Sequence, residues 1–204
     1  MTKGAVIIEG RKIPDIRKIV ENHLKHLPEW GCIFFHSAIN KKFIKKKLRN
    51  LKINFIELPV EINLENYNKL LCLASFWEYL PYDKILIFQS DSKILRPGIE
   101  AFMEYDYVGA PWTFQNHGGN GGFSLRTRLV MIDICKTHQN TYLQNEDTWF
   151  CNIMHNERIG KLAPREICSK FSCEQIFELN SFGYHSIDTW LTPEQCTIIK
   201  TQYK

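Results

Sequence analysis

One aspartate follows an apolar, strand-like segment in the middle of the chain. The segment Lys84–Leu95 reads KILIFQSDSKIL, and its apolar run, Ile85–Phe88, is typical of a strand buried on both faces. A carboxylate buried without a partner is costly, so Asp91 is expected to meet a cation, a helix N-terminus or water in a cleft. Ligands of parallel sheets bind beyond the carboxyl ends of the strands, which makes Asp91 a candidate active-site residue.

A second group of candidates combines glycines with acidic residues. Residues 116–122 read NHGGNGG, and the acidic pair Glu146 and Asp147 follows further along the chain. The glycines match neither the pattern G-x-x-x-x-G-K-[ST] nor G-x-G-x-x-G after a first strand, which argues against the two common nucleotide-binding loops. Glycines also occur in plain turns, but four of them leading into the β-like FSLR favour a site where backbone approaches a ligand closely.

Short apolar strands and amphipathic helices alternate in the first half of the chain. The expected strands are Ala5–Gly10, Gly31–Ser37, Lys52–Pro59 and the start of Lys84–Leu95. The expected helices are DIRKIVENHLKHL after Pro14, KKFIKKKLRN at residues 41–50, and Leu64–Leu80. This alternation predicts an α/β, Rossmann-like fold with a mostly parallel central sheet flanked by helices.

The second half is less regular. We expect a short strand within Tyr105–Trp112, a helix at LVMIDICKTH, a helix near the acidic pair and a late strand at FSCEQIF. Thr192, Pro193 and Gln195 stand at the cap, first and third positions of a final helix, as in a near capping box. No repeat or linker interrupts the chain, so a single domain spanning residues 1–204 is expected.

Composition narrows the classes of protein. Hydrophobic residues make up 44% and aromatic residues 13% of the 204, which excludes a disordered chain. No apolar run approaches the ~20 residues of a membrane span, and no leader peptide is expected at the N-terminus. The 7 cysteines contain no C-x-x-C, which predicts reduced packing residues and a cytoplasmic location.

Positive charge is concentrated in residues 41–50. The apolar Phe43, Ile44 and Leu48 fall on one helical stripe, so five lysines occupy the other face. A nucleic-acid or anionic-membrane patch is one interpretation of these lysines. A solvated helix face is the favoured one, because no aromatic residues are interleaved for base stacking, and no nucleic-acid partner is expected.

The motifs FQSDS, DYVGAPW, GNGGFSLR and ED-x-W-F, in this order, resemble a glycosyltransferase-like family of unknown function from microbes and large viruses. VIIEGR, YNKLLCLASFWEYLP, FSCEQIF and FGYHSIDTW are similar to that family too, so the resemblance runs from about Val6 to Trp190. It implies a GT-A fold and transfer of a sugar from a nucleotide-sugar donor to a carbohydrate or other hydroxyl acceptor. For a viral protein, the location would be the host cytoplasm.

The resemblance also implies which residues hold the donor. Glu9 and Arg11 follow the first strand, where GT-A enzymes hold the base and ribose of the nucleotide. Tyr67 and Lys69 would contact the nucleotide or its diphosphate, and Trp112 would border the donor sugar, although core packing is an equal alternative for Trp112. The remaining implied contacts are Ser90, Asp91, Ser92, Gly121 and Gly122.

Many GT-A enzymes hold Mn²⁺ or Mg²⁺ with a D-x-D motif, which this chain replaces with Asp91-Ser92-Lys93. Either Asp91 binds a divalent cation with help from elsewhere, or Lys93 partly substitutes for the charge of the metal. The resemblance implies His185 as the second metal ligand, and imidazole suits Mn²⁺. A purely structural histidine is the alternative.

By the same resemblance, Asp147 would be the general base that removes the proton of the acceptor hydroxyl, and Glu146 would orient the acceptor. Alternatively, both carboxylates only favour the N-terminal end of a helix dipole. Because the second aspartate of D-x-D is missing, a non-catalytic nucleotide-sugar or glycan-binding module derived from such an enzyme is the alternative function.

Overall fold

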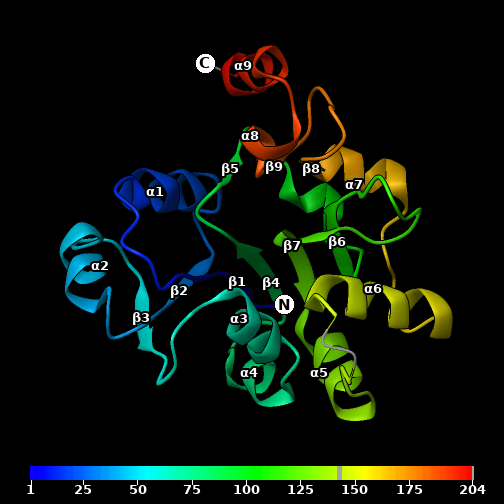
Figure 1. The fold of residues 1–204 in the computed structure, drawn as a ribbon, viewed down its shortest axis with the longest axis horizontal. Helices are drawn as coiled ribbons and strands as arrows, with labels where there is room; N and C mark the ends of the chain where they lie inside the picture. Colours follow the sequence, from blue (N-terminus) through cyan, green and yellow to red (C-terminus); the bar gives the residue numbers. More distant parts are fainter. Residues whose placement is uncertain (142–143, 204) are drawn as a thin grey trace.

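The computed structural model describes residues 1–141 and 144–203, and within these ranges a six-stranded sheet forms the centre of the molecule (Figure 1). Its strands lie in the spatial order β3 (Asn54–Glu57), β2 (Gly31–His36), β1 (Lys3–Ile8), β4 (Lys84–Phe88), β7 (Asn120–Thr127) and β6 (Tyr107–Ala110). The strands β3, β2, β1 and β4 are parallel, and β7 runs antiparallel to both β4 and β6. The predicted α/β fold with a mostly parallel sheet is confirmed.

Helices cover both faces of the sheet, which explains why the central strands are apolar throughout. Ala5 and Ile7 of β1 face one layer of helices, whereas Val6 and Ile8 face the other. The first layer contains α1 (Ile16–His26), α2 (Lys41–Lys47) and α7 (Arg165–Phe171). The second layer contains α3 (Leu64–Leu71), α4 (Ala74–Tyr79), α5 (Arg128–Thr137) and α6 (Glu146–Glu157). Figure 1 shows α1 and α7 on one side of the sheet and α3, α4 and α5 on the other.

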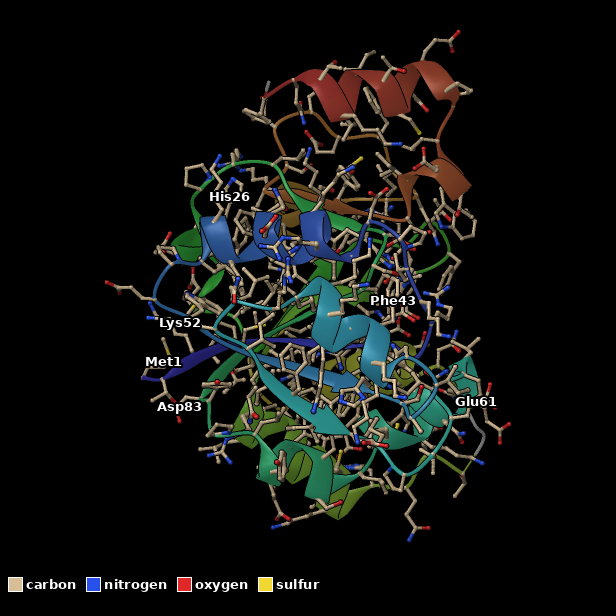
Figure 2. The ribbon with its side chains drawn as sticks, turned by 90° about the vertical axis from the view of Figure 1, so that its left-hand side faces the viewer. Met1, His26, Phe43, Lys52, Glu61 and Asp83 are labelled. Carbon is tan, nitrogen blue, oxygen red and sulfur yellow. The ribbon has the colours of Figure 1, made fainter. Side chains whose placement is uncertain are left out.

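A smaller sheet stands beyond the carboxyl end of β4. It has the order β5 (Ser92–Ile94), β9 (Gly183–His185) and β8 (Ser172–Cys173) in the part of the chain that the structure describes. The short helix η1 (Ile99–Phe102) follows β5, and α8 (Ile187–Trp190) and α9 (Pro193–Thr201) follow β9. The capping box at the start of α9 is present as predicted. In both views α9 lies at the end of the molecule, away from the large sheet (Figures 1 and 2).

Three predicted elements differ most from the structure. The helix expected at Leu64–Leu80 is broken into α3 and α4 because Leu73 is extended, and the indole N–H of Trp77 donates to the carbonyl of Leu71 at the break (2.7 Å). The expected glycine loop is shorter, because β7 already begins at Asn120. The strand expected at FSCEQIF is reduced to the two residues of β8.

The lysine-rich segment forms α2, which lies with β3 on the side of the molecule that faces the viewer in Figure 2. Its lysines are exposed, whereas Ile44 and Leu48 are buried, so the stripe predicted from the sequence is confirmed. Lys41 pairs with Glu57 of β3 at 2.6 Å. In the described part of the chain, no helix combines the length and the apolar character that crossing a membrane requires.

Candidate active site

Three polar side chains meet where β4 ends and the smaller sheet begins. Asp91 lies in the turn between β4 and β5, and its side chain is 52% exposed. His185 pairs with Ser92 in the antiparallel register of β5 and β9, which returns its imidazole to the same turn. The Nε2 atom of His185 lies 3.2 Å from Oδ1 of Asp91 and 3.1 Å from Oε1 of Gln89. The two predicted metal ligands are therefore adjacent, with Gln89 as a third polar group.

Two consecutive glycines of β7 connect this cluster to the start of α6. A Cβ atom on Gly122 would lie 2.3 Å from Nε2 of His185, and a Cβ atom on Gly121 would lie 2.3 Å from Oε1 of Glu146. Atoms of folded proteins do not approach this closely, so only glycine allows both side chains to reach the strand. Gly121 and Gly122 therefore mark the place where the two groups of candidate residues come together.

His185 is almost buried between two carboxylates. Its Nδ1 atom lies 3.4 Å from Oε2 of Glu174, whose side chain is 3% exposed. Burial alone would lower the pKa of His185, but Asp91 and Glu174 together raise that pKa to about 9. Burial is the largest influence on Asp91 and opposes its ionisation, but the hydrogen bond and the positive charge of His185, together with hydrogen bonds in the turn, lower the pKa of Asp91 overall. At neutral pH the metal-free cluster therefore contains a protonated imidazole.

Raising the pH should destabilise the metal-free protein through His185. The pKa of this group is about 9 in the folded chain against the ordinary 6.5, so its stabilising effect is complete below about pH 6.5 and disappears as the pH rises through about 9. The effect is at most about 3 kcal/mol. Thermal unfolding between pH 6.5 and 9.5 should show the loss, and His185→Gln should remove most of this pH dependence. His26→Gln, a control at a half-buried histidine of α1, should retain the pH dependence of the wild type. If His185→Gln lost stability with rising pH as the wild type does, the assignment of this pH dependence to His185 would be contradicted.

Asp147, in the first turn of α6, directs its carboxylate at backbone N–H groups. Its Oδ2 atom accepts from the N–H of Gly121 at 2.8 Å, which joins α6 to the start of β7. Its Oδ1 atom accepts from the N–H of Thr148 at 2.7 Å and from the Thr148 hydroxyl at 3.3 Å. A carboxylate offers about four lone-pair positions, so these three bonds fix its direction and leave one position for a ligand hydroxyl.

The carboxylate of Glu146 has no position left for a ligand. Its side chain is 3% exposed and pairs with Arg126 of β7 through two bonds, Nη1 to Oε2 at 2.6 Å and Nη2 to Oε1 at 2.9 Å. Burial raises the pKa of Glu146, and the guanidinium of Arg126 opposes that rise. The geometry corrects the prediction that Glu146 orients an acceptor, because Arg126 occupies both carboxylate oxygens and almost no surface of the side chain is left.

Most of the predicted nucleotide contacts gather around a cavity of about 250 Å³ next to Gln89. Glu9 and Arg11 line it and form an ion pair at 2.7 Å, and Arg11 also donates to the hydroxyl of Ser90 at 3.2 Å. Tyr67 closes the cavity from α3, and within the described residues its buried hydroxyl has no hydrogen-bond partner. Burial raises the pKa of Tyr67, so this hydroxyl keeps its proton and remains a donor for a ligand.

Of the predicted donor contacts that do not line this cavity, three have side chains that are paired or packed elsewhere. Lys69 pairs with Glu65 at 2.5 Å and lines a separate cavity of about 820 Å³, whose described lining contains no other predicted site residue. The hydroxyl of Ser92 is buried and donates to the carbonyl of Gln89 at 2.7 Å. Trp112 is 3% exposed and packs in the core. Lys69 and Trp112 are therefore not brought together with the other donor contacts, whereas Ser92 lines a third cavity, of about 350 Å³, with Ser90 and Asp91.

Residues 50–185, more than half of the chain, match the model of one protein family, described as "Protein of unknown function (DUF5672)". The chain belongs to this family. No curated protein matches this chain.

The fold of this DUF5672 protein is similar to two solved structures of the glycosyltransferase GlyE from Streptococcus pneumoniae TIGR4. The apo form has a TM-score of 0.53 and 12% sequence identity, over 95% of this chain and 55% of the GlyE chain. The other structure has a TM-score of 0.57 and 12% identity, over 94% and 56% of the two chains. This chain thus spans little more than half the length of the chains it matches. The predicted glycosyltransferase-like fold is confirmed by this likeness, which at 12% identity concerns the fold alone.

Three residues of the candidate site were not predicted from the sequence. Gln89 stands two residues before Asp91, so Gln89-Ser90-Asp91 has the spacing of D-x-D and begins two residues before Asp91-Ser92-Lys93. Glu174 was not predicted because it lies in FSCEQIF, a segment whose pattern predicts a strand. Arg126 carries no sequence signal, because nothing in the order of residues shows that this arginine is buried.

The donor atoms around Asp91 fit a hard divalent cation. Gln89 and Asp91 offer oxygen atoms and His185 offers a nitrogen, the ligand types that Mn²⁺ accepts. The described residues contain no group of three or more His, Cys, Asp and Glu side chains suited to a metal ion, so the amide of Gln89 would complete the set. Lys93 lies opposite Tyr184 in the register of β5 and β9, and it lines the same cavity of about 350 Å³ as Asp91. A partial replacement of the metal charge by Lys93 therefore stays a prediction.

Proposed function

We propose that this protein is a glycosyltransferase that moves a sugar from a nucleotide-sugar donor to a hydroxyl acceptor. The observation that carries the proposal is the meeting of two candidate groups at Gly121 and Gly122. The N–H of Gly121 holds Asp147, and Gly122 touches the cluster of Asp91 and His185. A donor sugar lying over these two glycines would have the diphosphate site on one side and a carboxylate base on the other.

The nucleotide of the donor would occupy the cavity beside β1. The hydroxyl of Tyr67 is a buried donor that lacks a partner in the described structure, and it would gain one from a ribose or base oxygen. The ion pair with Glu9 orients Arg11, whose side chain is 71% exposed and lines the cavity. The cavity continues to Gln89, so the diphosphate would extend from Arg11 toward Asp91.

A divalent cation, Mn²⁺ or Mg²⁺, would be held by Gln89, Asp91 and His185. It would supply positive charge to the diphosphate as the glycosidic bond of the donor breaks. His185 must give up its proton to bind a metal, so cation affinity should rise with pH.

Asp147 would accept the proton of the attacking hydroxyl. The bonds from Gly121 and Thr148 orient its carboxylate and leave a lone pair for the acceptor, as proton transfer to a positioned base requires. The acceptor is thus a carbohydrate or another hydroxyl compound that reaches the donor sugar from the side of α6.

A non-catalytic nucleotide-sugar or glycan-binding module is the second candidate. The observation that favours it is Gln89, a neutral amide at the place where a second carboxylate would bind a cation more strongly. Turnover of the donor in the presence of an acceptor separates the two candidates, because a binding module would hold the donor without consuming it.

The cysteines support a reducing location for this activity. The seven cysteines are free thiols, and five of them are buried. Burial raises the pKa of Cys32, for example, to about 12, which keeps the thiol protonated and unreactive. Free, protonated thiols support the proposal of a cytoplasmic location.

A panel of nucleotide-sugars should reveal the donor by thermal shift. A donor present at ~100 times its dissociation constant adds about 2.7 kcal/mol of stability, which for a domain of this size raises the melting temperature by roughly 5–10 °C. We expect a shift with at least one uridine, guanosine, cytidine or thymidine diphosphate sugar, and a larger one with Mn²⁺. A flat response across the whole panel would count against the proposed function.

Asp91→Asn serves as the matched variant in this panel. The asparagine keeps the shape of the side chain but removes a negative charge from the cation, so the metal-dependent part of the shift should disappear. Without ligand the melting temperature should fall only by the part of the His185 effect that Asp91 supplies, because the Asp91 side chain is half-exposed and Glu174 still faces the imidazole. Failure of this variant to fold would instead assign Asp91 a structural role.

A further inference from the structure

The proposed reaction makes no direct use of one buried charged group, the guanidinium of Arg126. The residue is fully buried, and its guanidinium carbon lies 4.8 Å from the ring centre of Tyr107, 5.6 Å from that of Trp77 and 5.7 Å from that of Phe150. Its partner, Glu146, comes from the first turn of α6. An ion pair thus replaces apolar packing at the contact between α6 and β7.

The N–H groups of Arg126 bond both to the segment around Gly121 and to Glu146 in the first turn of α6. The Nε atom donates to the hydroxyl of Ser124 at 2.9 Å, and that hydroxyl donates to the carbonyl of Gly121 at 2.9 Å. The Nη2 atom lies 3.4 Å from the same carbonyl, and Nη1 and Nη2 hold Glu146. The carbonyl of Gly121 is therefore held through Arg126, whereas its N–H is held by Asp147.

Stability alone does not explain this arrangement. A buried ion pair is often no more stabilising than apolar side chains of similar volume, because both charges lose their hydration. The aromatic surroundings of Arg126 would accept such an apolar pair. Apolar residues cannot fix the orientation of a neighbouring side chain in this way. The planar guanidinium of arginine binds both oxygens of a carboxylate and so fixes both its distance and its rotation.

We propose that Arg126 and Glu146 are positioning residues that lock the first turn of α6 against β7, so that the adjacent Asp147 keeps its carboxylate on the N–H of Gly121. The importance of Asp147 for sugar transfer rests on the proposed function, but the positioning itself does not. Thr148 provides an internal reference, because its N–H donates to Asp147 from within the same helix and does not depend on the contact between α6 and β7.

The test is an NMR measurement on the isolated protein without ligand. In the wild type, the amide signals of Gly121 and Thr148 should follow the protonation of Asp147 together during a pH titration. The double variant Arg126→Met with Glu146→Leu replaces the pair with apolar side chains. It should lose the response of Gly121 and keep that of Thr148.

Arg126→Lys provides a second variant, in which the charge is kept and the fork is lost. Glu146 stays paired, so this variant should fold, and it should also lose the response of Gly121. A folded variant of either kind in which Gly121 still follows Asp147 as in the wild type would overturn the proposal. Unfolding of both variants would overturn it as well, because the pair would then be required for folding.

Activity gives a separate readout. Where the wild type transfers a sugar, both variants should lower kcat by about 10-fold or more and leave the donor KM nearly unchanged, because a displaced base impairs the chemical step and spares donor binding. A wild type that transfers no sugar would speak against the proposed function, while the response of Gly121 would still decide the positioning.

Discussion

Asp147→Asn should lower the rate of sugar transfer by about 10²–10⁴-fold, the usual contribution of a positioned general base. Asparagine preserves the shape of the side chain, and its amide oxygen can still accept from the N–H of Gly121. It lacks the basic lone pair that takes the proton of the acceptor hydroxyl. Donor affinity, measured by thermal shift, should therefore stay within a factor of a few, and the loss should appear in kcat.

Asp133→Asn is the matched control, since Asp133 is exposed on α5 and none of the candidate site residues is near it in the sequence. The same chemical change there should leave the rate unaltered. A near wild-type rate in Asp147→Asn would exclude Asp147 as the base. If donor binding and turnover fell together, Asp147 would belong to the donor site or to the fold.

The large sheet could be predicted from the sequence because its strands are continuous apolar runs. Segments such as Ile85–Phe88 are buried on both faces, and the helices between them keep a helical period. The break between α3 and α4 could not be predicted, because the apolar period continues through Leu73. Only the tertiary contact of Trp77 with the carbonyl of Leu71 shows how the broken helix is stabilised.

The candidate site could be predicted only in part. Asp91 was found from its place after a buried strand, and His185 from the resemblance; the pairing of β5 with β9 that brings them together was not foreseen. The two residues are 94 positions apart, and no local pattern encodes a register over such a separation. For Glu146 the sequence was misleading, since an acidic residue beside a base looks functional until its buried partner, Arg126, is known.

Arg126→Met alone should be among the most destabilising single changes in this protein. It would leave Glu146 buried and unpaired at the start of α6, and removal of one partner of a buried ion pair costs about 3–5 kcal/mol. The midpoint of urea unfolding at pH 7 should fall accordingly. The deficit should shrink as the pH is lowered to 5, because the pKa of an unpaired, buried Glu146 rises above its value in the unfolded chain and protonation then removes the uncompensated charge.

The double variant Arg126→Met with Glu146→Leu decides whether Arg126→Met loses stability through the unpaired charge of Glu146 or through lost packing. If the penalty comes from an unpaired charge, the second substitution should restore most of the stability, although it removes still more of the original contacts. If the lost stability comes from lost packing around Tyr107 and Phe150, the double variant should be at least as unstable as the single one. Its deficit relative to the wild type should then be the same at pH 5 and at pH 7. A single variant within about 1 kcal/mol of the wild type, the range of exposed ion pairs, would show that water reaches this pair. The contact between α6 and β7 would then be too loose to hold Asp147 in place.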